Sequence, residues 1–434
     1  MSLTIVLALG LLLTTATKFR VHGLPVGPGE FLIVIWIVLR FLQSLAADEL
    51  PLTPPLRRML VFWAWFTVAE ALGTLNALII GYPHDTGLFL HDVMAYPLVG
   101  MIACLSVLGA DAEARMRQVT RAMVTWGTIL LLPQVAAGFH LIRLPMIDPW
   151  FGNRFEGWST NPNQLAFLCA VLVLAALHLA DTAASTRGRA ASIAGMIVPL
   201  VIGRLTRTDT FTFALLAAIM VFLFCKARIW LNWRGPLPSL RPLLAGLVII
   251  IAPMLLLAAA PFAIRATSDT THLAMGLMKK GGGEAKQEAD LRFALWHEAI
   301  GIGLRASMLG LGPGPHLSIP PELVAARETE LKLDKGAGHP PVNGTPDFEA
   351  HNTFLDLFTQ GGLIADFSVI WLIGSAALRT WKAQTAGLTA MLTGLSFFAL
   401  TNLIVREPEF WFGLVLCLLA GTGRAARLAQ QDRR

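Results

Sequence analysis

Long apolar runs separated by short polar segments make up most of this sequence. The runs are continuously apolar, without alternation, and most approach the roughly 20 residues that a helix needs to cross a bilayer. They therefore predict membrane-spanning helices and not the strands of a barrel. Twelve runs stand out, near residues 2–17, 30–46, 59–80, 91–110, 119–139, 163–180, 190–203, 210–225, 242–264, 353–378, 386–405 and 409–422. The expected fold is an all-α polytopic membrane protein with about twelve transmembrane helices.

One polar segment, residues 265–350, interrupts this pattern between the ninth and tenth runs. Within it, residues 284–305 predict an amphipathic helix with Leu291, Leu295 and Ile302 on one side. We expect this segment to form a cap over the membrane helices. The chain then divides into helices one to nine (1–264), the cap loop (265–350), and helices ten to twelve with a basic tail (351–434).

Composition excludes an ordinary water-soluble enzyme. Of the 434 residues, 55% are hydrophobic and only 14% are charged, whereas an average soluble protein carries about 25% charged residues. The net charge of +6 is too small to indicate a nucleic-acid partner, so the expected surroundings are membrane lipids. The four cysteines form no CxxC or Cys/His cluster, so neither a zinc site nor a disulfide framework is expected.

Lys and Arg residues predict the orientation of the chain in the membrane. One set of alternate loops, together with the C-terminal tail, holds seventeen cations, while the opposite short loops hold seven. Cytoplasmic loops carry the excess of cations, so both termini are expected inside and residues 265–350 in the periplasm of a bacterial inner membrane. The seven cations on the outer side are Lys18, Arg20, Arg143, Arg154, Arg204, Arg207 and Arg406.

Polar residues that are costly near a membrane gather on this outer side, and the first group precedes the sixth run. Asn161 is expected to cap a helix that begins at Pro162, with Asn163 following. Capping does not explain the nearby Arg154, for which an anionic ligand and a carboxylate partner are both open.

A second group, Arg204 and Arg207, lies at the tip of a predicted helical hairpin. The two arginines are three residues apart and would share a face if they were helical. Paired guanidinium groups can grip a diphosphate through bidentate hydrogen bonds. The alternative is that they reach lipid headgroups, with Asp209 as an ion partner.

The third group belongs to the amphipathic cap helix, where Arg292 precedes Trp296 by one turn. Arg292 is a candidate for a bound anion beneath the cap. The alternatives are a solvated helix face or a pair with Glu288, four residues earlier.

The fourth group opens the tenth run at His351 and Asn352. A helix N-terminus disfavours imidazolium and so favours the neutral ring that a general base requires. The alternative is a histidine that is only hydrogen-bonded at the interface. Further along the run, Asp356 and Asp366 are expected to face the bundle interior, and the pair Gly361-Gly362 indicates close packing or a local break. His316, in a Gly/Pro-rich stretch, is expected to be structural or solvated.

Taken in order, these segments resemble the O-antigen ligase and O-antigen polymerase family. The resemblance runs from about residue 60 to 420 and depends on order and topology, because no single motif is specific. One departure is Thr206, where family members often have Ser before the arginine; the hydroxyl is retained. The segments that carry the resemblance are Gly152–Gly157, Asn161–Asn163, Thr206-Arg207, Arg292 with Leu295-Trp296, Gly310–Gly314 and His351-Asn352.

The resemblance implies a glycosyltransferase similar to the C-type glycosyltransferases, without a metal or other cofactor. Such enzymes take a glycan from undecaprenyl diphosphate on the periplasmic side; ligases join it to lipid A–core and polymerases to another lipid-linked repeat. By the same resemblance, His351 activates the acceptor hydroxyl, while Arg207 and Arg292 bind the diphosphate. Arg204 and Arg154 are further candidates for the diphosphate, and Asn161, Asn163 and Trp296 for other parts of the substrates.

The sequence favours O-antigen ligase among the readings of this pattern. The main alternative is a polymerase of the same family, for O-antigen or exopolysaccharide, because both activities need the same donor site. A lipid-linked glycan transporter would need charged residues along the bundle interior and cations on both faces. Here the unusual polar residues gather at one face, which favours an enzyme over a transporter.

Overall fold

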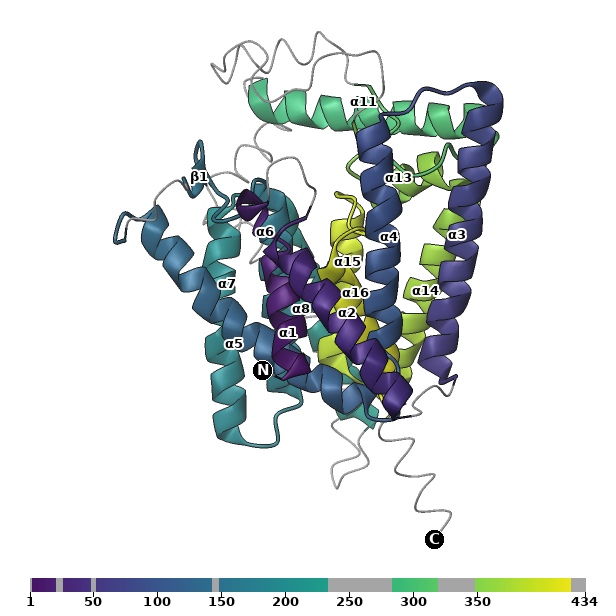
Figure 1. The fold of residues 1–434 in the computed structure, drawn as a ribbon. Helices are drawn as coiled ribbons and strands as arrows, with labels where there is room; N and C mark the ends of the chain where they lie inside the picture. Colours follow the sequence, from purple (N-terminus) through teal and green to yellow (C-terminus); the bar gives the residue numbers. More distant parts are fainter. Residues whose placement is uncertain are drawn as a thin grey trace.

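The computed structural model is a bundle of α-helices with one helix lying across one end (Figure 1). It describes residues 2–20, 26–47, 52–142, 148–232, 283–318 and 348–422. The helices are α1 (Leu3–Leu13), α2 (Pro28–Ala46), α3 (Pro54–Ile80), α4 (Thr86–Ser106), α5 (Ala112–Gly138), α6 (Pro162–Asp181), α7 (Thr186–Leu205), α8 (Asp209–Asn232), α11 (Gly283–Arg305), α13 (Thr353–Gln360), α14 (Gly362–Ala383), α15 (Ala386–Ala399) and α16 (Pro408–Leu419). A 3-10 turn (Thr17–Phe19) and a short antiparallel hairpin, β1 (Trp150–Phe151) and β2 (Arg154–Phe155), complete the described elements.

The all-α membrane fold expected from the sequence is confirmed. Seven of the described helices are long and apolar enough to cross a membrane, and α1, α15 and α16 are shorter apolar helices. Eleven of the twelve predicted runs fall on described helices. The remaining run, 242–264, lies outside the described residues, so the number twelve stays a prediction.

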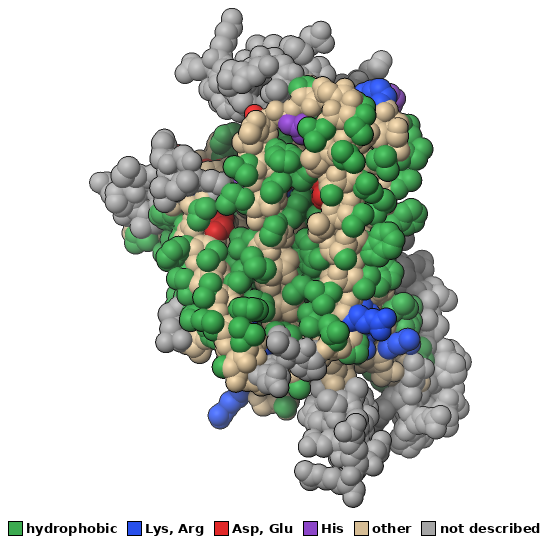
Figure 2. Space-filling model, turned by 45° about the vertical axis from the view of Figure 1, so that its right-hand side comes forward, with side chains coloured by type: hydrophobic (Ala, Val, Ile, Leu, Met, Phe, Trp, Pro, Cys, Tyr) green, Lys and Arg blue, Asp and Glu red, His purple; other side chains and the backbone are tan. Residues whose placement is uncertain are grey.

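Successive helices run in alternate directions, so the loops gather at two ends of the bundle (Figure 1). Cations of the richer set lie near the beginning of α3, α5 and α7 and near the end of α14, and these helix ends are at the lower end in that view. In Figure 2, apolar side chains cover the middle of one face. The assignment of the lower end to the cytoplasm remains a prediction from the charge rule.

Helix α6 occupies the centre of the bundle, because its sequence is apolar on every side. In its most apolar 18-residue window, 83% of the residues are buried, against a third or less in the other helices that could span. It packs against α5, α7, α8, α15 and α16. The predicted start of this helix is confirmed: Asn161 Oδ1 accepts a hydrogen bond from Asn163 N at 2.9 Å, and Pro162 is the first helical residue.

Of the two alternatives for the glycine pair at 361 and 362, the structure shows the local break, because the run over 353–378 divides there into α13 and α14. Gly362 has a φ of +63°, a left-handed conformation that glycine adopts without strain. The turn that follows α11 covers the end of α13, with the amide groups of Leu311 and Gly312 donating to the Gln360 carbonyl at 2.9 and 2.8 Å. A Cβ on Gly310 would lie 2.0 Å from that carbonyl oxygen, so the turn needs glycine there. The break therefore exchanges α-helical hydrogen bonds for contacts with the cap.

The amphipathic cap helix is confirmed as α11, which lies across the ends of α3 and α4 (Figure 1). Its Leu295 and Ile302 are buried in a small second core with Ala77, Leu311 and Leu317. The side chain of Leu291 lies outside the described residues. This apolar contact holds α11 directly over α13.

Candidate functional site

Arg207 lies in the tight turn that joins α7 to α8, at the upper end of the bundle. Its φ is +53°, which is unusual for a residue with a side chain and costs on the order of 1–3 kcal/mol. The side chain is exposed, whereas the neighbouring Thr206 and Thr208 are buried. The surrounding structure therefore fixes both neighbours of Arg207 and leaves the guanidinium at the surface.

Arg154 holds this turn in place. Its Nε donates to the Thr206 carbonyl at 3.1 Å, and its Nη2 donates to Thr208 Oγ1 at 3.1 Å and to Asn163 Oδ1 at 2.7 Å. The Thr208 hydroxyl also donates to Asn163 Oδ1, at 3.1 Å. The β-hairpin, the start of α6 and the α7–α8 turn thus meet on one guanidinium. These contacts give Arg154 a structural role, and Asn161 the role of a helix cap.

Arg204 and Arg207 would share a face only if both were helical, and Arg207 is not part of a helix. Helix α7 ends at Leu205, and the left-handed backbone at Arg207 turns the chain away from the helical path. Arg204 Nη1 donates to Thr212 Oγ1 at 2.5 Å, on the first turns of α8. Arg204 therefore has a partner on α8, and Arg207 lies in the turn between the two helices.

His351 lies in a second tight turn, directly before α13. Its φ of +51° is again left-handed, and its side chain is half-buried. Its ring packs edge to face against Phe348, with centroids 5.2 Å apart. Asn352 caps α13, since its Oδ1 accepts from Phe354 N at 3.1 Å and Leu355 N at 3.3 Å. The sequence therefore correctly places His351 at a helix N-terminus.

Buried Asp356 holds the backbone on both sides of His351. Its Oδ1 accepts from Ala350 N at 2.6 Å and its Oδ2 accepts from Asn352 N at 3.2 Å. The Ala350 carbonyl accepts from Trp296 Nε1 of α11 at 3.0 Å. The expected inward position of Asp356 is confirmed. Trp296 ties the cap helix to this turn, and Arg292, which is half-buried, lies one turn earlier on the same helix.

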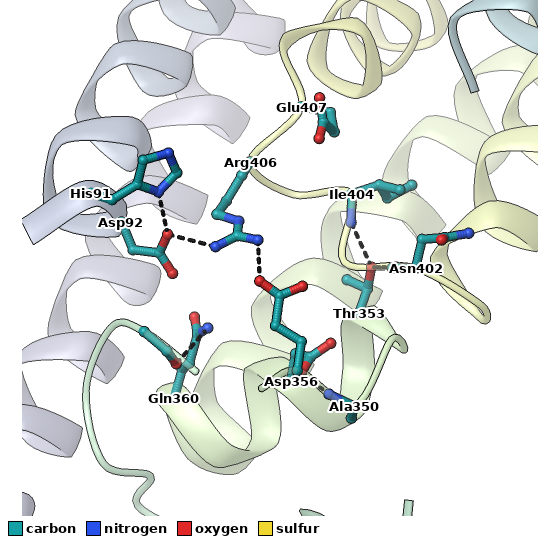
Figure 3. A network of polar contacts seen from close by, with 12 residues as sticks. His91, Asp92, Ala350, Thr353, Asp356, Gln360, Asn402, Ile404, Arg406 and Glu407 are labelled. Carbon is teal, nitrogen blue, oxygen red and sulfur yellow. Dashed lines mark hydrogen bonds and ion pairs between the residues drawn. The ribbon is translucent and has the colours of Figure 1, made fainter. Parts of the chain in front are cut away.

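A third group of polar side chains is centred on Arg406 (Figure 3). The sequence did not predict a functional role for this arginine. Its Nη1 pairs with Asp92 Oδ1 of α4 at 2.7 Å, and its Nη2 pairs with Glu349 Oε1. His91 Nδ1 lies 3.0 Å from the same Asp92 oxygen. Burial alone would lower the pKa of Arg406, but the carboxylates of Glu349 and Asp92 outweigh it and hold that pKa well above its usual value. A carboxylate at position 92 inside an apolar run was the available signal.

The segment between α15 and α16, residues 400–407, joins the two turns. On one side Thr401 Oγ1 lies 3.0 Å from Thr210 Oγ1 on α8, and Glu407 accepts from Gln164 Nε2 of α6 at 3.1 and 3.3 Å. On the other side Thr353 Oγ1 donates to the Asn402 carbonyl at 2.6 Å and accepts from Ile404 N at 3.1 Å (Figure 3). The segment therefore contacts elements next to Arg207 and next to His351.

Of the two alternatives expected for His316, structural or solvated, the structure shows the first. It is buried beside the rings of Tyr82 and His84, and its Nε2 donates to the Gly312 carbonyl at 2.7 Å. Burial lowers the pKa of His316 to about 4, so the ring is neutral near pH 7. Across the described ranges, no group of three or more His, Cys, Asp or Glu side chains is placed to hold a metal ion.

Comparison with known protein families gives a match that covers the part of the chain that contains these turns. Residues 170–370 match the family model described as O-antigen ligase, a range that contains Arg207, Arg292 and His351. No curated protein matches the chain. The family supports a glycan-transfer role in O-antigen assembly, on lipid-linked glycan and lipid A–core substrates in general, and the match applies equally to ligases and polymerases. The chain is therefore a multi-pass membrane protein in which residues 170–370 match the O-antigen ligase family.

Proposed function

We propose that this protein is an O-antigen ligase, which moves a glycan from undecaprenyl diphosphate to a sugar hydroxyl of lipid A–core on the periplasmic side. His351 acts as the general base, and Arg207 and Arg292 bind the diphosphate. The observation that carries the proposal is the position of these residues within residues 170–370, with the segment 400–407 bonded both to Thr210, three residues after Arg207, and to Thr353, two residues after His351. The upper end of the bundle in Figure 1 is then the periplasmic end.

The proposed step breaks one bond and forms one. The acceptor hydroxyl oxygen attacks the anomeric carbon of the donor sugar, while the bond from that carbon to the diphosphate oxygen breaks. The hydroxyl proton passes to the His351 imidazole, and undecaprenyl diphosphate leaves with the bonding electron pair. Because the donor is already activated, no nucleotide is required.

The leaving diphosphate gathers negative charge as the sugar bond breaks, and fixed cations stabilise such charge in the transition state. Arg207 is suited to this task because its guanidinium is exposed on a braced turn. Arg292 lies on α11, which Trp296 fastens to the residue before His351. The proposed diphosphate site therefore lies between the α7–α8 turn and the cap helix.

The decisive experiment separates the products. Purified protein in lipid vesicles is supplied with undecaprenyl-diphosphate glycan, with or without lipid A–core, and the products are resolved by gel and mass spectrometry. We expect glycan on lipid A–core and none in the His351→Ala variant. A ladder of repeats on the prenyl carrier would instead identify a polymerase. Passage of intact donor across the vesicle membrane without glycan transfer would identify a transporter.

A further inference from the structure

The guanidinium of Arg406 joins two carboxylates that come from distant parts of the chain. Asp92 belongs to α4 and is fully buried, while Glu349 ends the cap segment and is 23% exposed on its side chain. Arg406 itself is 20% exposed, so the network is partly screened from water. Removing one partner of such a pair leaves an uncompensated charge. The position of Glu349 relative to α4 is therefore strongly specified.

Glu349 also lies two residues before His351. The two neighbours of His351, Ala350 and Asn352, are each fixed by their own hydrogen bonds. Ala350 is bonded through both its amide and its carbonyl, and the amide of Asn352 is bonded to Asp356. The left-handed backbone of His351 is strained, and strain of this kind persists only where the surroundings over-determine it. The ion pair of Glu349 supplies the fixed point on the N-terminal side of this turn.

The backbone just before Arg406 is also fixed by hydrogen bonds. The segment that carries it accepts and donates hydrogen bonds at Thr353, the first residue of α13, and Trp411 Nε1 donates to the Val405 carbonyl at 2.7 Å. The arginine is therefore fixed against α13 and α16 before its side chain reaches Glu349. A fixed cation can impose a position on Glu349, whereas a mobile one could only follow it.

We propose that Arg406, acting through Glu349 and held by Asp92, is a positioning residue that sets the location of the His351 imidazole. The inference rests on the proposed role of His351 as the base. Catalytic groups lose rate steeply when they are displaced by about 1 Å, on the order of 10²-fold. Loosening the Glu349 contact should therefore slow the chemical step and leave donor binding in place.

Glu349→Gln is the primary test, because it preserves the shape of the side chain and removes its charge. Full-length protein in vesicles is assayed for kcat and for the KM of undecaprenyl-diphosphate glycan, per folded molecule. We expect kcat to fall on the order of 10-fold to 10²-fold, with the donor KM within about twofold of wild type. Arg406→Lys keeps the charge but loses the guanidinium fork that spans two carboxylates. Its kcat should therefore lie between that of wild type and that of Glu349→Gln.

Asp181→Asn is the matched control. Asp181 is likewise a carboxylate paired with a cation, Lys226, at 2.8 Å, but it lies at the opposite end of the bundle. It should leave kcat unchanged even if it lowers thermal stability. An equal loss of kcat in Asp181→Asn and Glu349→Gln would assign the effect to general destabilisation and overturn the proposal.

A double-mutant cycle with His351→Gln distinguishes positioning of His351 from a general structural role. It compares the loss of activity caused by Glu349→Gln in the wild-type and His351→Gln backgrounds. If Glu349 acts through His351, adding Glu349→Gln to His351→Gln should cost no further activity. The same fold loss in both backgrounds would overturn the positioning role, as would a wild-type kcat in Glu349→Gln alone. Full activity of the single His351→Gln variant would instead remove the base itself, and with it both proposals.

Discussion

The turns around Arg207 and His351 share a backbone conformation and differ in the chemistry that holds them. Both residues have φ between +50° and +55°, and both are flanked by residues with fixed hydrogen bonds. The Arg207 turn is held by hydroxyl, carbonyl and amide groups that converge on Arg154. The His351 turn is held by carboxylates, from Asp356 directly and from Glu349 through Arg406.

The two side chains also differ in exposure, since Arg207 is exposed and His351 is half-buried. A residue that captures a charged, flexible ligand can tolerate some freedom of its side chain. A base must meet a hydroxyl within hydrogen-bonding distance, and so it depends on a rigid support. We therefore expect changes near Arg207 to alter donor affinity, and changes near His351 to alter turnover.

The largest effect is expected for His351→Gln, which keeps hydrogen bonding and removes basicity. General-base assistance is worth about 10²–10⁴-fold, and kcat should fall by that factor while donor binding stays near wild type. For wild type we expect the rate to fall on the acid side between about pH 5 and 9, as it does when a general base is protonated, and for the Gln variant we expect no such fall. A Gln variant that keeps most of its turnover and the acid limb would reduce His351 to positioning the acceptor.

A smaller loss, mainly in donor affinity, is expected for Arg207→Ala. Charge-assisted hydrogen bonds contribute about 1.5–3 kcal/mol each, so donor binding should weaken on the order of 10-fold to 10²-fold. Arg207→Lys should recover only part of it, because the ammonium lacks the planar fork. Arg189→Ala, an exposed arginine near the other end of α7, is the control. Equal donor binding in the Arg207 and Arg189 variants would exclude Arg207 from the diphosphate site.

Arg154→Gln tests whether the support of Arg207 matters as much as the residue itself. Loss of the contacts to Thr206, Thr208 and Asn163 should raise the donor KM about tenfold and change kcat little. Thr208→Val removes one of these contacts and keeps the Arg154 charge. If Thr208→Val reproduces part of the loss, Arg154 acts through the turn. If only the Arg154 variant is affected, its guanidinium binds the ligand directly.

The smallest effect is expected for Trp296→Phe, which deletes the hydrogen bond to the Ala350 carbonyl and keeps an aromatic ring. One neutral hydrogen bond contributes about 0.5–1.5 kcal/mol, so kcat should fall about two- to tenfold. Leu304→Ala, at an exposed position on the same helix, should have no effect on turnover. A change in donor KM instead of kcat would show that Trp296 contributes to donor binding, as proposed for Arg207, and not to the support of His351.

Local signals in the sequence predicted much of this architecture. Apolar runs marked the helices, Asn161 with Pro162 marked the start of α6, and the glycine pair at 361 and 362 indicated close packing or a break, of which the structure shows the break. Such features depend on a few neighbouring residues, so they can be read without a fold. At Arg204 and Arg207 the spacing of three residues gives a shared face only in a helix, and local signals did not show that α7 ends at Leu205, before Arg207.

The support of the His351 turn could not be predicted in this way. Asp92 and Arg406 are 314 residues apart, and nothing in the sequence pairs one charge with the other. Asp356 was expected to be buried, but its acceptance of two amides depends on the path of the turn itself. Candidate site residues were therefore predictable as types, whereas the contacts that orient them required the fold.

The junction of α3, the turn after α11 and the α13–α14 break is built from backbone with almost no room for side chains. A Cβ on Gly73 would lie 2.3 Å from the Gln360 oxygen, and one on Gly362 would lie 2.0 Å from the Met308 oxygen. In a saturation mutagenesis screen for surface glycan, these glycines should therefore score as severely as His351. They would differ in protein abundance, because a methyl group here prevents assembly of the bundle whereas His351→Gln leaves it intact. Measuring membrane-inserted protein alongside glycan output would separate the positions needed for folding and assembly from the positions needed for catalysis.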